Sequence, residues 1–283
     1  MLDMMDATVG IRIAGTLCAC MLAASATPQT PSPQLPSVQE IVQRSAQATH
    51  LDWETAPDFD FCEMDRLHGG TKTYQVTMIS GSPYYRLVAS DDVQLSKEED
   101  QIQNQKFAAA VQQRQQETPD QHQHRVAQYE KDRRRDQLIL DEFAQAMSFT
   151  LTGTKLIDGY EAYLLSAVPK PGYVPRSIET RVLRAARGTM WIDEKSFRWV
   201  KVEAEVMHPV MIEGFLARIE PGTRFELEER PIGDPSGAWL ITHLEIDSHA
   251  SILLLFPSSS HTDETYFHYA PSGSLPPQEC LHP

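Results

Sequence analysis

The back half of the chain alternates apolar and charged residues over several successive segments, and this period of two constrains the fold most strongly. In residues 200–206 every even position is Val or Ala and every odd position is Lys or Glu. The same alternation returns at 224–228 and 240–247. Segments of this kind are strands with one buried face and one solvated face. The pattern therefore predicts successive antiparallel strands joined by short turns.

The apolar positions of these segments define the surface that the fold has to bury. They are Val200, Val202, Val206, Phe215, Ile219, Phe225, Leu227, Leu244 and Ile246. Ordinary core packing is one role for them, because apolar strand faces are buried in any fold. If the buried surface is concave, the same side chains together line a site for an apolar ligand.

Helical patterns occur in three places. Ser37, followed by Glu40, begins a helix over 37–48. Residues 96–147 predict two helices separated at Pro119, and their sparse apolar residues suggest a protruding or lid-like hairpin outside the core. A third helix is expected near 178–186. The predicted fold class is mainly β with helices (α+β): a curved antiparallel sheet forming a half-open β-barrel covered by helices.

The N-terminal residues predict export. An apolar run from Ile13 follows Arg12 and ends in small residues at Ala26, which predicts a signal peptide over 1–26. The alternative is a lipoprotein signal that acylates Cys20. Residues 27–36, rich in Pro, Ser and Gln, predict a linker. We expect a periplasmic protein without a transmembrane span in the mature chain, or one anchored through Cys20.

Cysteine use and charge restrict the partners. After cleavage only Cys62 and Cys280 remain, and an oxidising compartment permits a disulfide between them, although two separate thiols are the alternative. The formal net charge of −14 argues against nucleic acid or an anionic lipid surface as the main partner.

Recognisable catalytic motifs are absent from the sequence, so we expect no enzyme activity and no cofactor. The densest group of possible metal ligands is His261, Asp263, Glu264 and His268. These residues lack a known ligand spacing, and we therefore predict no metal site.

One stretch carries a family resemblance. The residues GTMWIDEK at 188–195, followed by RWVKVE at 198–203, resemble the strand–turn–strand of the LolA-like superfamily of outer-membrane lipoprotein carriers and lipoprotein-sorting proteins. Residues 159–165, 169–173, 222–226 and 237–240 resemble the neighbouring segments. The resemblance implies a LolA/LolB-like single domain over 37–270, with a helical insertion at 96–147 and a tail at 271–283. It also implies that an apolar concavity binds acyl chains.

Two hypotheses about function follow. The first is an envelope protein that holds an acyl chain, a lipid or a lipoprotein in the concavity. The second is a non-enzymatic envelope interaction module with a filled core, whose partner surface lies on the 96–147 helices. The sequence leaves both open.

Overall fold

The computed structural model describes residues 35–283 except 68, 213–216, 234, 253–255 and 282–283. The predicted signal peptide and all but the last two residues of the predicted linker lie outside the described residues.

The described residues form one antiparallel sheet of 13 strands. Its main path runs β4-β3-β2-β1-β13-β12-β11-β8-β7-β6-β5, and the short β10 pairs with β12 and β9. The sheet is open, because β4 and β5 are its two edges. The strands are β1 (Phe59–Leu67), β2 (Gly70–Ile79), β3 (Ser82–Ser90), β4 (Val93–Gln94), β5 (Met147–Ile157), β6 (Tyr160–Pro169), β7 (Ala186–Asp193), β8 (Trp199–Val206), β9 (Val210–Met211), β10 (Ala217–Ile219), β11 (Arg224–Pro231), β12 (Trp239–Ile252) and β13 (Phe256–Pro271).

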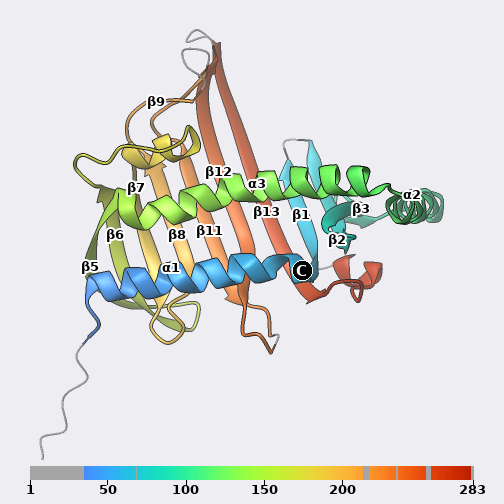
Figure 1. Ribbon diagram of the computed structural model, residues 1–283, viewed down its shortest axis with the longest axis horizontal. Helices are drawn as coiled ribbons and strands as arrows, with labels where there is room; N and C mark the ends of the chain where they lie inside the picture. Colours follow the sequence, from blue (N-terminus) through green and yellow to red (C-terminus); the bar gives the residue numbers. More distant parts are fainter. Residues whose placement is uncertain (1–34, 68, 213–216, 234, 253–255, 282–283) are drawn as a thin grey trace, which may run out of the picture. The chain divides into compact units, whose positions relative to one another are not determined.

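Two long helices lie across the same face of this sheet (Figure 1). They are α1 (Val38–Thr55) and α3 (Pro119–Ala146), and the face that they cover is called the inner face below. The opposite face is the outer face. The predicted fold class is confirmed as a large antiparallel sheet with helices, although the sheet does not close.

The helix ends follow their capping residues. The Ser37 hydroxyl accepts a hydrogen bond from the Glu40 amide at the start of α1, which continues to Thr55, beyond the predicted end at 48. Capping boxes begin α2 (Lys97–Gln115) at Ser96 and α3 at Thr118. The predicted helix at 178–186 is a 3-10 helix, η2 (Glu179–Arg184); the other 3-10 helices are η1 (Ala56–Asp58) and η3 (Pro277–Leu281).

The two helices predicted to protrude behave differently from each other. Helix α2 has no buried residue and packs beside β3, where Arg114 donates to the carbonyl oxygens of Ile79, Ser82 and Pro83. The end of α3, by contrast, belongs to the core, since Ala146 is fully buried. The prediction that the whole hairpin stands outside the core is therefore wrong for α3.

The C-terminal segment is part of the same unit as the sheet. Cys280 in η3 forms a disulfide with Cys62 of β1, the pairing considered from the sequence, with a Cα–Cα distance of 5.2 Å. Both cysteines are fully buried and pack against Val88 and Leu275. The described residues after 270 are thus held against the outer face of β1 through the disulfide and η3.

Candidate apolar binding site

The main apolar cluster lies between the inner face and the two long helices. Strand residues supply most of it, and Ile41 of α1 is fully buried among them. Leu140 and Phe143 of α3 pack against the cluster, and the Phe143 ring lies 6.2 Å from the Trp199 ring. Its buried members are Ile41, Tyr163, Leu165, Met190, Ile192, Phe197, Trp199, Val202 and Leu227.

A pocket of about 130 Å³ opens between α1 and α3 above this cluster. Its walls are mostly apolar, and Ala46 and Ala144 lie on its α1 and α3 sides. The pocket is lined by Val42, Ser45, Ala46, Thr49, His50, Trp53, Gln137, Leu140, Asp141, Phe143, Ala144, Phe149, Met190, Ile192 and Trp199. Pockets for drug-sized ligands measure roughly 300–1,000 Å³, so this one holds only part of such a molecule.

Polar contacts join the two helices at the mouth of the pocket. The Gln137 side chain lies 3.2 Å from His50 Nδ1, and Arg133 donates to the carbonyl oxygen of Trp53 at 2.5 Å. The Arg133 guanidinium also lies 3.9 Å from the centre of the Trp53 ring, a cation–π contact. These contacts hold α1 against α3.

The predicted ligand-binding residues fall into different places. Val202 and Leu227 are in the main cluster, with Phe225 and Leu244 packed against it. Val206 and Ile219 pack together in a separate cluster at Ala185 and Val210. Ile246 lies opposite Phe225 in the β11–β12 ladder and is partly buried. Phe215 lies outside the described residues, and none of the described predicted residues lines the pocket.

Val200 is on the other face of the sheet, which corrects its predicted inward position. The ladder between β7 and β8 shifts register between Trp191 and Ile192, which pair with Lys201 and Trp199. A bulge of this kind places two successive residues on one side. Val200 consequently packs with Trp191 and Trp239 in an outer cluster, while Trp199 enters the main cluster.

Sequence reasoning missed the helical side of the pocket. The apolar residues Leu140 and Phe143 were visible near the end of the second predicted helix, but the polar residues before them suggested an exposed hairpin. The α1 residues that line the pocket recur at 42, 45–46 and 49–50, the spacing of one helix face. That spacing is the sequence signal from which the α1 side of the pocket could be predicted.

A buried ionic group anchors the end of α1 to the sheet. Arg198 Nε lies 2.6 Å from Asp52 Oδ2, and Asp52 Oδ1 also accepts from the Trp239 amide at 3.2 Å. The charges of Asp52 and Arg198 both act on the nearby Glu229. Burial and the charge of Asp52 raise the pKa of Glu229 to about 8, although the charge of Arg198 opposes the rise. Among the described residues Glu229 Oε2 has no hydrogen-bond partner.

The inner face becomes polar toward β13, β1 and β2. Glu63 stands opposite Tyr74 and Tyr266 in the two ladders, and Tyr266 donates to Glu264 at 2.5 Å. Burial, together with the charges of Asp65 and Glu264, raises the pKa of Glu63 to about 8. The inner face therefore combines an apolar half under the helix pair with a half that carries acids and tyrosines.

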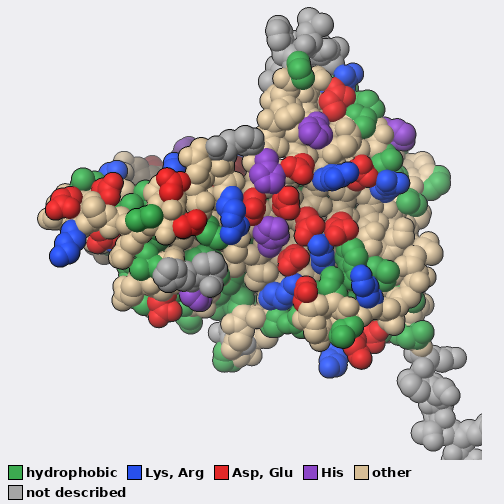
Figure 2. Space-filling model, turned by 180° about the vertical axis from the view of Figure 1, so that it is seen from behind, with side chains coloured by type: hydrophobic (Ala, Val, Ile, Leu, Met, Phe, Trp, Pro, Cys, Tyr) green, Lys and Arg blue, Asp and Glu red, His purple; other side chains and the backbone are tan. Residues whose placement is uncertain are grey.

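The outer face is strongly charged (Figure 2). Carboxylates, cationic side chains and histidines gather there over β8, β11, β12 and β13. The possible metal ligands at 261–268 that the sequence brings together do not all lie on one face of the sheet. Asp263 lies 3.2 Å from His243 on the outer face, whereas Glu264 contacts Tyr266 on the inner face. Among the described helices, none is long and apolar enough to cross a membrane.

Comparisons with known proteins give a likeness of fold. No family model and no curated protein matches the chain. A LolA superfamily protein from Nitrosomonas europaea is similar over 86% of this chain and 97% of its own, with 11% identity and a TM-score of 0.33. An outer membrane lipoprotein-sorting protein domain from Vibrio parahaemolyticus is similar over 84% of this chain and 97% of its own, with 10% identity and a TM-score of 0.32. One chain in the structure of the MucA/MucB complex of Pseudomonas aeruginosa is similar over 83% of this chain and 99% of its own, with 8% identity and a TM-score of 0.23.

Proposed function

We propose that this protein is an exported, periplasmic envelope protein that binds an apolar ligand, such as an acyl chain of a lipid or lipoprotein, between its inner face and the α1–α3 pair. The observation that carries the proposal is the pocket between the two helices, whose floor is the main apolar cluster. In this proposal the protein binds its ligand without chemical change and without a cofactor. The mature protein is either released by signal-peptide cleavage after residue 26 or anchored to a membrane through an acylated Cys20.

The small volume of the pocket sets a condition on binding. An acyl chain needs more room than 130 Å³, so the ligand must replace contacts that α1 and α3 make with each other or with the sheet. The polar contacts of Gln137 and Arg133 lie at the helix–helix junction, where such a separation has to occur. Each CH₂ group that enters the apolar space contributes about 0.8 kcal/mol. A long chain can therefore offset the loss of a few polar contacts.

Filling the pocket should prevent binding. We expect Ala46→Trp and Ala144→Trp each to weaken the binding of a fluorescent C16 fatty acid at least about tenfold, because the added ring occupies the space that the chain needs. The measurement is a fluorescence titration, with an organic extract of the purified protein examined for co-purified lipid by mass spectrometry. Ala108→Trp, at an exposed position of α2, is the matched control and should bind as the wild type does. Equal affinity in all four proteins, with no lipid in the extract, would contradict the proposal.

The second candidate is an interaction module with a filled core, and the exposed surface of α2 favours it. No described residue of α2 is buried, and the Ile102 side chain is 50% exposed. In this case a photo-crosslinking residue in place of Ile102 should capture one envelope protein in cells. The same residue in place of Leu156, an exposed apolar side chain at the opposite sheet edge, should capture none. Similar capture at both positions would argue against a specific surface on α2.

A further inference from the structure

The outer face carries a row of carboxylates that the strand register places directly opposite one another. Glu203, Glu226, Glu245 and Asp263 are consecutive partners across β8, β11, β12 and β13, and the next partner on β1 is Arg66. Side chains paired in this way have Cβ atoms about 4.5–5.5 Å apart, and like charges at that distance destabilise a sheet. The row is therefore a place where a bound cation lowers the free energy of the folded protein.

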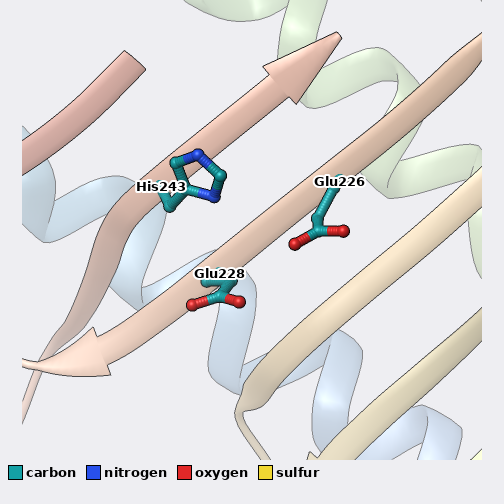
Figure 3. Close-up of side chains that lie close together, drawn as sticks. All are labelled: Glu226, Glu228 and His243. Carbon is teal, nitrogen blue, oxygen red and sulfur yellow. The ribbon is translucent and has the colours of Figure 1, made fainter. Parts of the chain in front are cut away.

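A group of side chains that can bind a metal lies partly on this row, at Glu226, and partly on the neighbouring row, where Glu228 pairs with His243 (Figure 3). Glu226 and Glu228 of β11 and His243 of β12 each offer a ligand atom, and these atoms lie within 4.8 Å of one another. All three side chains are partly buried. Two carboxylates and one imidazole are three ligands of types that bind zinc, and three protein ligands leave a fourth position open for water.

A fourth residue, Asp263, holds His243 in the tautomer that can bind a metal. His243 Nε2 lies 3.2 Å from Asp263 Oδ1, and a carboxylate can only accept, so Nε2 carries the hydrogen in the neutral ring. Nδ1 then has a free lone pair. Histidines that bind metals almost always donate their other N–H group to a carboxylate or carbonyl in this way.

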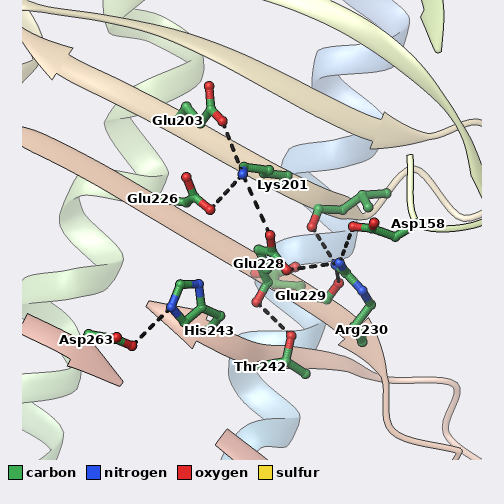
Figure 4. A network of polar contacts seen from close by, with 11 residues as sticks. Asp158, Lys201, Glu203, Glu226, Glu228, Glu229, Arg230, Thr242, His243 and Asp263 are labelled. Carbon is green, nitrogen blue, oxygen red and sulfur yellow. Dashed lines mark hydrogen bonds and ion pairs between the residues drawn. The ribbon is translucent and has the colours of Figure 1, made fainter. Parts of the chain in front are cut away.

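Two cationic side chains, Lys201 and Arg230, contact the carboxylates of this site (Figure 4). Lys201 Nζ lies 2.6 Å from Glu226, 3.1 Å from Glu203 and 3.7 Å from Glu228. Arg230 also reaches the site and lies 3.0 Å from Glu228 Oε2. Two cationic side chains thus balance three carboxylates. A divalent cation would supply a larger charge and could use the imidazole, which lysine cannot. Its binding requires Lys201 to move away from Glu226 and Glu228.

We infer that Glu226, Glu228 and His243 bind a zinc-type divalent transition metal on the outer face, with Asp263 orienting His243. The imidazole selects against Mg²⁺ and Ca²⁺, which prefer ligand sets made only of oxygen. Because the pocket lies on the inner face, the site is independent of the proposed apolar ligand.

Calorimetric titration of the metal-free, tag-free mature protein with Zn²⁺ tests the site. We expect saturable binding that excess Mg²⁺ does not displace. His243→Ala should weaken it at least about tenfold, and Asp263→Asn about 10–100-fold. Lys201→Met should tighten it, because the competing ammonium is gone.

A neighbouring group provides the matched control. Glu245, Asp247 and His261 also bring their ligand atoms within 4.8 Å, but His261 Nδ1 already contacts Asp247 at 2.7 Å inside that group. His261→Ala should leave the high-affinity binding unchanged. Three results would each overturn the inference: no saturable Zn²⁺ binding to the wild type, loss of binding in His261→Ala but not in His243→Ala, or weaker binding in Lys201→Met.

Discussion

Replacing Arg198 with methionine should lower the free energy of unfolding by about 3–5 kcal/mol, because it leaves the buried Asp52 carboxylate without its partner. The Asp52 side chain is almost completely buried, and Arg198 holds both of its oxygens, Oδ2 at 2.6 Å and Oδ1 at 3.1 Å. Methionine keeps much of the arginine stem and removes the charge. The nearby Glu229 side chain, whose pKa is raised partly by Asp52, cannot supply a positive charge.

The expected loss depends on burial, and an exposed pair provides the control. Arg187 and Glu205 form an ion pair at 3.0 Å, with 59% and 31% of their side chains exposed. Exposed pairs contribute roughly 0–1 kcal/mol, so Arg187→Met should change stability by no more than that. Urea denaturation of both variants measures the difference. A loss below 1 kcal/mol in Arg198→Met would mean that water reaches Asp52 and that the group does not anchor α1.

The same variant bears on the proposed binding site. Asp52 is in the last turns of α1, and its partners Arg198 and Trp239 belong to the sheet side. Ser45, about two turns earlier, accepts a hydrogen bond from Trp199 Nε1 at 2.9 Å. α1 is therefore fixed to the sheet by polar contacts at two levels. This arrangement means that α1 cannot leave the floor of the pocket without breaking these contacts.

The strands were predictable because a period of two is a local property of the sequence. Residues 202–206 and 224–228 alternate in the structure as they do in the sequence. The position of Val200 was not predictable, since valine fits the alternation equally well with or without a bulge. The bulge shows only in the β7–β8 register, which depends on two strands together.

The pocket depends on contacts between segments far apart in the chain, and sequence patterns do not give such contacts. Ala46 and Ala144 face the same space although 97 residues lie between them. The disulfide was left open for the same reason, because sequence spacing does not give a Cα separation. The outer-face metal ligands are likewise joined only by the pairing of β11 with β12.

The protein should become less stable as the pH rises from about 4.5 to about 8, and Glu229 should be a main cause. Burial raises its pKa from 4.5 to about 8, so over this range the folded protein holds a proton that the unfolded chain releases. Stability falls with rising pH wherever the folded state binds more protons. Each unit of pKa difference corresponds to about 1.4 kcal/mol, so Glu229 accounts for about 5 kcal/mol across the whole range. Glu63, with its pKa also raised to about 8, adds to the fall in the same direction.

Glu229→Gln separates this effect from the rest of the titration. Glutamine has nearly the same shape and stays neutral, so the variant should match the wild type near pH 4.5 and exceed its stability by about 5 kcal/mol at pH 9. Glu161→Gln, at an exposed strand position, should leave the profile unchanged. Denaturation in urea between pH 4.5 and 9 gives the three curves. If Glu229→Gln falls in parallel with the wild type, then Glu229 is ionised in the folded protein, and Arg198 rather than a proton neutralises the carboxyl groups beneath α1.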